Sequence, residues 1–482
     1  MAERRRWPVR FLAEIVVLTL LALALVSLEL DLGERWFGWG PADPRTDPSA
    51  VAPPEGLKLP VSGVAPVVAK TGSAVAVDPA RVAATVRPFL RKAVLGKHYA
   101  VVVTDLSTGR PVFGQGAPTI TPASTTKLLT STAALESLGP MARFRTSVTW
   151  SAASRQLVLV GGGDPFLAST PRLARVGYPN RADVVTLAQR TVRKLKAMNV
   201  TRVRLAFDDS YFSGPSFNPA WPATYRPEEV VPPISALWVD EGHSAAGFGF
   251  GYMEDPAAGA ARIFRSALIE AGLAVTPGVR RADSPPNAVD VSSVSSAPLG
   301  EIVERTLEVS DNQAAEVLAR HVGLAEKQEG SFEAGAASVL EVVHRLGVPT
   351  AGDQLYDGSG LSRHNRLTPA TLAGVLQLSE RPAKPELRHV FTGLPVAGFT
   401  GSLQYRFDEG PTKARGRVRA KTGTLTGVHG LAGTVDDLSR ARMTFVVVAD
   451  RVPLPKSLEA QTLIDRLAAA LGACRCGVGS TP

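Results

Sequence analysis

The stretch PASTTKLLT, residues 122–130, places Ser124 three residues before Lys127. The proline ends a loop, and apolar residues at helical spacing predict a helix that begins here and ends at LGP, residues 138–140. Residues three apart on a helix have Cβ atoms about 5–6 Å apart, so the serine hydroxyl and the lysine amine can share a proton. Taken by itself, the pattern more often indicates a capping hydroxyl followed by a solvated lysine, so the rest of the chain has to decide.

Two further short motifs each occur twice. S-x-N appears as SFN at 216–218 and as SDN at 310–312, and K-T-G appears at 70–72 and at 421–423. The first copy of each lies in a proline-rich loop or in a spacer that precedes the folded chain. The second SxN copy lies between two predicted helices, and the second KTG copy lies on a predicted strand. The ordered set S-x-x-K, S-D-N and K-T-G therefore predicts one catalytic site.

A serine hydroxyl is a weak nucleophile and needs a base. The chain has no G-x-S-x-G elbow, and no histidine neighbours Ser124 in sequence, so a Ser-His-Asp triad is not indicated. Lys127 can serve as the base if it is neutral, and burial together with a second cation, Lys421, would lower its pKa. The backbone N–H groups of Ser124 and Thr424 are the candidates for an oxyanion hole.

The remaining motif residues suit substrate binding. Ser310 can relay a proton to a leaving amine, and Asn312 can hydrogen-bond a substrate amide. Lys421 and Thr422 offer a charge and a hydroxyl to a carboxylate. Gly423 leaves room for the substrate backbone beside the strand.

The three motifs in this order resemble the D-alanyl-D-alanine carboxypeptidase/endopeptidase family of low-molecular-mass penicillin-binding proteins, class C or peptidase S13, the penicillin-binding protein 4 type. In that family a large insertion separates S-x-x-K from S-x-N, as it does here. Further stretches that resemble the family are GGGDP at 161–165, DDSYF at 208–212, ISALWVDEG at 234–242, YDGSGLSRHNRLTP at 356–369 and LPVAGFTGSLQYRF at 394–407.

The resemblance implies an α+β, penicillin-binding/β-lactamase-like transpeptidase fold with an inserted α/β domain. It implies a serine-type carboxypeptidase that acts on peptidoglycan stem peptides, and the family alone also implies DD-endopeptidase activity on cross-links. β-Lactams would then be covalent inhibitors of Ser124. No cofactor is implied, and the seven histidines show no metal-ligand spacing, so no catalytic metal is predicted.

The predicted secondary structure agrees with this fold class. Strands near both ends of the folded chain suggest one mixed, mainly antiparallel sheet flanked by helices. The predicted strands lie within 97–115, 144–165, 202–209, 417–425, 428–437 and 441–450. The predicted helices lie within 78–94, 181–198, 256–273, 300–309, 313–323, 332–347, 368–379 and 458–472.

The chain divides into segments of different composition. The expected segments are a basic cytoplasmic tail at 1–10, a transmembrane anchor or signal segment at 11–30, a Pro/Ala-rich spacer at 31–75, the first catalytic part at 76–145, an inserted accessory domain at 146–290, the second catalytic part at 291–472 and a disordered tail at 473–482.

The N-terminal segment predicts a membrane anchor. Arginines precede an apolar run of 18 residues in which Glu14 is the one charge, and Trp36 and Trp39 follow it. This order predicts that the N-terminus lies inside and the rest of the chain outside the cytoplasm. A cleaved signal peptide is the alternative, but the run offers no clean small-x-small cleavage site.

The net charge and the two cysteines limit which binding partners and cross-links the sequence predicts. The net charge of +9 favours anionic surroundings, yet no nucleic-acid-binding module is recognisable, so no nucleic acid is expected. The two cysteines, Cys474 and Cys476, are too close to join domains. They can hold a metal ion or form an intermolecular disulfide, but a disordered tail is favoured.

Two other functions compete with the carboxypeptidase. The chain can be a membrane-tethered wall-binding or scaffold protein with little catalytic activity, or a β-lactamase; intact motifs argue against the first and the long insert against the second. Asp357, Ser359 and Ser362 can line the cleft, although Gly and Ser in such a run more often form a turn.

Overall fold

The computed structural model describes residues 75–244 and 251–479. The expected tail at 1–10, the anchor at 11–30, nearly all of the spacer and the first K-T-G at 70–72 lie outside these residues. Within the two described ranges, no helix is both long and apolar enough to cross a membrane.

The first sheet is built from both ends of the described chain. Its strand order is β2-β1-β11-β10-β9, and every neighbouring pair is antiparallel. The expectation of a mixed sheet is corrected here, because β1 and β2 form a hairpin and β9, β10 and β11 form a meander. The strands are β1 Tyr99–Asp105, β2 Pro111–Gly116, β9 Val418–Leu425, β10 Val428–Asp436 and β11 Arg442–Ala449.

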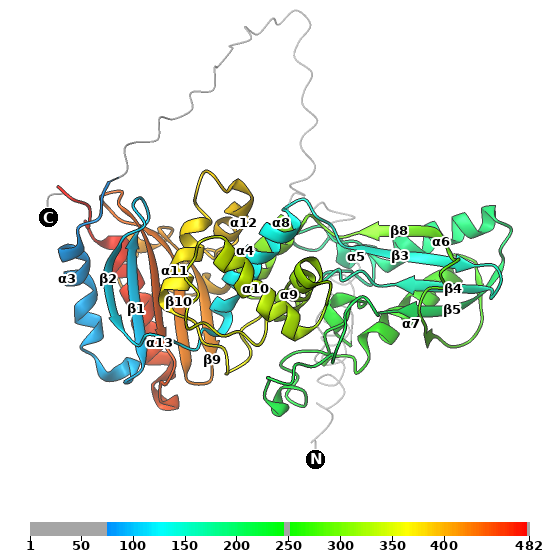
Figure 1. The fold of residues 1–482 in the computed structure, drawn as a ribbon, viewed down its shortest axis with the longest axis horizontal. Helices are drawn as coiled ribbons and strands as arrows, with labels where there is room; N and C mark the ends of the chain where they lie inside the picture. The colour runs from blue at the N-terminus through cyan, green and yellow to red at the C-terminus, as the bar shows by residue number, and fades with distance from the viewer. Residues whose placement is uncertain (1–74, 245–250, 480–482) are drawn as a thin grey trace, which may run out of the picture. The chain divides into compact units, whose positions relative to one another are not determined.

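Alternating side chains of this sheet enter two different cores. In β11, Val446 and Val448 pack against one helical layer, while Phe445 and Val447 pack against the other. Helices α3 (Pro79–Leu90) and α13 (Ser457–Ala473) cover the second face, and α11 (Pro369–Leu378) covers the first (Figure 1). The sheet is thus buried on both faces, which accounts for its nearly continuous runs of valine.

The helices around α11 carry two of the three motifs. They share the apolar core on the first face of the sheet. Their bounds are α4 Lys127–Leu138, α8 Leu299–Glu308, α9 Asn312–Lys327, α10 Phe332–Arg345 and α12 Arg388–Thr392. All the predicted helices of this part are confirmed, and the short α12 was not predicted.

A second sheet lies between α4 and α8 in sequence. Its order is β6-β5-β4-β3-β8, with β7 beside β5, and β3 pairs antiparallel with β4 and β8 whereas β5 pairs in parallel. Two helices pack on it around one core (Figure 1). The elements are β3 Arg145–Ser151, β4 Gln156–Val160, α5 Pro171–Ala174, α6 Val184–Ala197, β5 Arg202–Asp208, α7 Pro256–Glu270, β6 Ala274–Val275, β7 Arg280–Arg281 and β8 Val289–Ser295. Strand β8 was not predicted, because its serines hide the apolar alternation.

The C-terminal segment is ordered as far as it is described, which corrects the expectation of a disordered tail for residues 473–479. Cys474 and Cys476 form a disulfide with each other, and Cys476 is fully buried. The Cys476 amide donates to Asp437 Oδ2 (2.6 Å), and Gly477 bridges to Val77. The segment is therefore fixed against both ends of the folded chain.

Candidate active site

Ser124 lies on a 3₁₀ turn, Ala123–Thr126, that leads directly into α4. Side chains at positions i and i+3 of a 3₁₀ helix eclipse one another, so the turn aligns Ser124 with Lys127. Lys127 Nζ donates to Ser124 Oγ at 2.9 Å. The predicted pair is thus in contact, and the predicted helix begins one turn later than expected.

Two glycines allow other segments to approach this turn. A Cβ atom added to Gly360 would lie 1.9 Å from the carbonyl oxygen of Ala123, and one added to Gly423 would lie 2.8 Å from that of Pro122. Gly423 was expected to leave room for the substrate backbone. In the structure the missing side chain lets β9 touch the serine turn.

Lys127 is fully buried and donates to three acceptors. Besides Ser124 Oγ, these are Asn312 Oδ1 and the backbone carbonyl of Ser359, both at 2.7 Å. Burial lowers the pKa of Lys127 to about 8, against the opposing effect of the carboxylates of Asp357, Glu316 and Asp311. At pH 7 about one Lys127 in ten is therefore neutral, far more than for a lysine with its usual pKa.

The SDN motif forms the turn between α8 and α9, as predicted. Ser310 has φ 63°, a left-handed conformation that reverses the chain there. Asp311 caps α9 by accepting the Ala314 amide at 2.9 Å, and Asn312 is the first residue of the helix. Ser310 and Asn312 consequently face the two lysines of the site from one short segment.

Lys421 lies on β9, at the edge of the first sheet. It is fully buried and donates to Ser310 Oγ at 2.7 Å and to the Thr422 carbonyl at 2.9 Å. Burial lowers the pKa of Lys421 well below its usual value, and the positive charges of Lys127 and Arg406 add to this effect. Among the described residues, its hydrogen-bond acceptors are hydroxyls and a carbonyl.

The hydroxyl of Thr422 contacts a residue that the sequence analysis did not single out. Ser402 Oγ lies 3.1 Å from Thr422 Oγ1. Thr424 is exposed two residues further along the same strand, so it lies on the same face of β9 as Thr422. The segment that carries Ser402 had been noted for its resemblance to the family, but nothing in its pattern indicated this contact.

The DGSGLS run forms a buried turn, which agrees with the favoured interpretation. Asp357 accepts hydrogen bonds from the Gly360 amide (2.9 Å), from the Ser362 amide (2.5 Å) and from Trp221 Nε1 (2.8 Å). The turn nevertheless contributes to the site, because the Ser359 carbonyl binds Lys127.

The first S-x-N copy, at 216–218, has a structural role. Asn218 is buried, donates to the Tyr356 carbonyl at 2.7 Å and accepts the Ala220 amide at 2.9 Å. Its side chain is therefore engaged with backbone groups, and it supports the residue that precedes the Asp357 turn.

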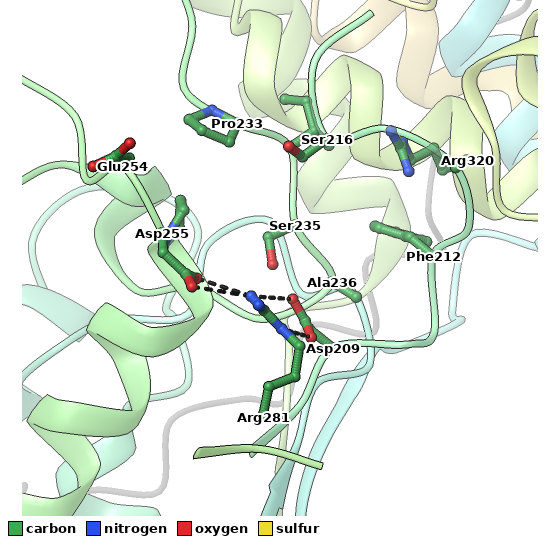
Figure 2. Close-up of a pocket in the computed structure, with 13 residues that line it drawn as sticks. Asp209, Phe212, Ser216, Pro233, Ser235, Ala236, Glu254, Asp255, Arg281 and Arg320 are labelled. Atoms are coloured by element: carbon green, nitrogen blue, oxygen red, sulfur yellow. Dashed lines mark hydrogen bonds and ion pairs between the residues drawn. The ribbon is translucent and has the colours of Figure 1, made fainter. Parts of the chain in front are cut away.

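A polar pocket of about 250 Å³ lies in the insert (Figure 2). At its centre the Arg281 guanidinium lies between Asp209 and Asp255, with Nε 2.8 Å from one carboxylate and a terminal nitrogen 3.1 Å from the other. These ion pairs join β7 to Asp209, the residue after β5, and to Asp255, which caps the N-terminus of α7. The charges of this pocket are thus largely paired with each other.

Comparison with known proteins places this site in a family. Residues 82–248 and 250–471 match the D-Ala-D-Ala carboxypeptidase 3 (S13) family. The chain belongs to this family. The S13 match includes all three motifs, and it extends through the insert and the meander that carries Lys421.

Two S13 relatives are similar over most of their length. Carboxypeptidase DacB of Mycolicibacterium smegmatis is 34% identical over 387 residues, which are 78% of this chain and 80% of the relative. A carboxypeptidase of Mycobacterium tuberculosis is 33% identical over 445 residues, 89% and 90% of the two chains. The crystal structure of penicillin binding protein 4 from Haemophilus influenzae superposes with a TM-score of 0.64 at 19% identity, over 80% of this chain and 97% of that one. The fold is therefore of the penicillin-binding/β-lactamase type.

Proposed function

We propose that the protein is a serine-type D-Ala-D-Ala carboxypeptidase that trims peptidoglycan stem peptides through an acyl-enzyme on Ser124. The observation that carries this proposal is the hydrogen bond between Lys127 Nζ and Ser124 Oγ at 2.9 Å, with the lysine fully buried. The names of the S13 relatives support the same reaction.

In the first step Ser124 Oγ attacks the carbonyl carbon between the two D-alanines, and its proton passes to neutral Lys127 Nζ. The carbonyl oxygen becomes an oxyanion, for which the backbone N–H groups of Ser124 and Thr424 are the proposed donors. Asn312 holds Lys127 through Oδ1, which leaves its Nδ2 hydrogens available to a substrate carbonyl.

In the second step the C–N bond breaks and the departing nitrogen of D-alanine takes a proton. Ser310 is the proposed donor, and its hydroxyl is replenished from Lys421, which donates to it at 2.7 Å. The proton that Lys127 took from Ser124 then restores Lys421, which leaves Lys127 neutral again. Water hydrolyses the ester: neutral Lys127 accepts the proton of the attacking water and returns it to Ser124 Oγ as the ester C–O bond breaks.

The substrate carboxylate is proposed to bind Lys421 and Thr422. Lys421 is buried among hydroxyls and near two other cations, so bringing a carboxylate to it supplies a missing counter-charge. Ser402 orients the Thr422 hydroxyl from behind. This arrangement favours a substrate that ends in a free carboxylate.

The proposed location is outside the cytoplasm, with residues 11–30 as an anchor in the cell membrane. There the site meets peptidoglycan, and hydrolysis of D,D-cross-links would be a second activity of the same serine. β-Lactams, which mimic D-Ala-D-Ala, would acylate Ser124 and remain bound.

The test uses the full-length chain in detergent and a soluble stem-peptide mimic. We expect release of D-alanine, and a stable adduct of a labelled β-lactam on Ser124 by mass spectrometry. The matched control is Ser124→Ala, which removes one oxygen. No D-alanine release above this control, together with no adduct, would refute the enzyme and favour the scaffold interpretation; rapid turnover of the adduct would indicate a β-lactamase.

A further inference from the structure

A buried acid lies behind one of the three acceptors of Lys127. Glu316, on α9, accepts the Ser359 amide at 2.7 Å through Oε1, and both of its carboxylate oxygens lie 3.2 Å from the Gly358 amide. The side chain of Glu316 is fully buried. Its carboxylate thus binds two consecutive amides of the segment whose next carbonyl, that of Ser359, receives Lys127.

The same segment is held from two other directions. Thr130 Oγ1, on α4, donates to the Gly358 carbonyl at 2.7 Å. A Cβ atom added to Gly358 would lie 2.5 Å from Ala319 Cβ and 2.8 Å from the Ala315 carbonyl oxygen. The peptide is therefore pressed against α9, and its orientation depends on the hydrogen bonds at its two faces.

Helix α9 contacts Lys127 twice. Asn312 and Glu316 are one turn apart and lie on the same face of the helix. Asn312 binds the lysine directly, and Glu316 reaches it through the Ser359 peptide. We propose that Glu316 is a positioning residue, which holds the Ser359 carbonyl where it receives Lys127 Nζ and so keeps the lysine aimed at Ser124. This inference rests on the proposed role of Lys127 as the base.

The charge of Glu316 should affect the pKa of Lys127, which can be measured as the midpoint of the pH profile of acylation. The charged groups around Lys127 are Glu316, Asp357 and Asp311, with Lys421 opposing them. Burial and the nearby Asp357 raise the pKa of Glu316, whereas the hydrogen bonds from the Gly358 and Ser359 amides favour its carboxylate form. Loss of the Glu316 carboxylate removes one stabiliser of the ammonium form, and the pKa of Lys127 falls further.

The experiment measures the acylation rate of the full-length chain by a fluorescent penicillin across pH 5.5–9.5. For Glu316→Gln we expect the high-pH plateau to fall about 10–100-fold, because an NH₂ group replaces one of the two acceptor oxygens and the neutral side chain holds the Gly358 and Ser359 amides less firmly. We also expect the midpoint to move down by about 1 pH unit. Glu316→Asp keeps the charge but shortens the reach, so its plateau falls while its midpoint stays near that of the wild type.

The control for a loss of packing is Val322→Ala, a buried position six residues after Glu316 on α9. It lowers stability without moving the midpoint. A Glu316→Gln profile with an unchanged midpoint, or with an unchanged plateau, overturns the proposal.

Thr130→Val keeps the test decisive if the Glu316 variants do not fold. It removes only the hydrogen bond to the Gly358 carbonyl, so we expect a several-fold lower plateau at an unmoved midpoint. A wild-type plateau in this variant overturns the inference. If Ser124→Ala still forms the adduct, the proposed function fails instead, so the two failures are distinguishable.

Discussion

The two lysines of the site are equally buried, but the charged groups that surround them differ. Lys127, at the start of α4, lies among three carboxylates of the protein, and burial still lowers its pKa to about 8. Lys421, on the edge strand β9, has cations as its charged neighbours, Lys127 and Arg406. Among the described residues, the same residue type at the same depth therefore has an internal counter-charge at one place and none at the other.

This difference assigns the two lysines to different tasks. A lysine with counter-charges already in place can gain and lose a proton without disturbing the site, which suits a base. A lysine without one gains most from a ligand that brings a negative charge, which suits carboxylate recognition. Each prediction below tests one side of this contrast.

The largest effect is expected for Lys127→Arg. Arginine keeps the positive charge but cannot deprotonate in a protein, so it cannot accept the Ser124 proton. We expect the rate of β-lactam acylation to fall by about 10²–10⁴-fold or more. Stopped-flow or mass-spectrometric adduct formation measures this, with circular dichroism to verify folding. A folded variant that acylates at nearly the wild-type rate would leave Lys127 as only a charge beside the helix.

Lys421→Gln should affect substrates according to their terminal charge. Because the carboxylate loses its buried partner, kcat/KM for a peptide ending in D-Ala-D-Ala should fall about 100-fold or more. A peptide with the terminal amide should lose much less. Lys421→Arg, which keeps a charge, should retain most of the discrimination. Equal losses on both peptides would contradict a carboxylate-binding role.

The pH dependence of acylation should follow Lys127. Below its pKa of about 8 the lysine is mainly protonated, so the reactive fraction and the acylation rate should fall about tenfold per pH unit. Above that pKa the rate should level off. The measurement is the acylation rate of the wild type from pH 5.5 to 9.5 at constant ionic strength. A flat profile over this range would refute the neutral-lysine mechanism.

The smallest effect is expected for Ser402→Ala. This change removes one hydrogen bond to the Thr422 hydroxyl, which is worth about 0.5–1.5 kcal/mol. We expect KM for the carboxylate peptide to rise a few-fold at nearly constant kcat. Ser457→Ala, which removes a hydroxyl bonded to His429, is a matched control. A change in kcat alone would assign Ser402 to the chemistry instead.

Short-range patterns predicted much of this molecule. The helices of the catalytic part and the strands of the first sheet were recognisable from periodicity, because each depends on residues close in sequence. The placement of Ser124 beside Lys127 followed from spacing in the same way. The contact between Ser310 and Lys421 was expected from the family resemblance. No short-range sequence pattern predicts it.

Contacts between distant segments were not predictable in this way. The Ser359 carbonyl that binds Lys127 is a backbone group, and any residue supplies one. Glu316 lies one turn after Asn312, so its face of α9 was predictable, but its partners on the Asp357 turn were not. The position of the Cys474–Cys476 disulfide also involves a distant contact, because the Cys476 amide donates to Asp437.

The C-terminal disulfide segment also helps to attach the start of the described chain to the fold. Residues 75–78 are joined to three separate parts of the fold: Val75 bridges to Ala441, the Val77 amide donates to Asp105, and the Asp78 amide donates to the Cys476 carbonyl at 2.7 Å. Tension on the chain that precedes residue 75 would therefore act on these three attachments together. The attachments lie at the end of β1, beside the start of β11 and on the C-terminal segment, so tension would enter the sheet away from β9, the edge strand that carries Lys421.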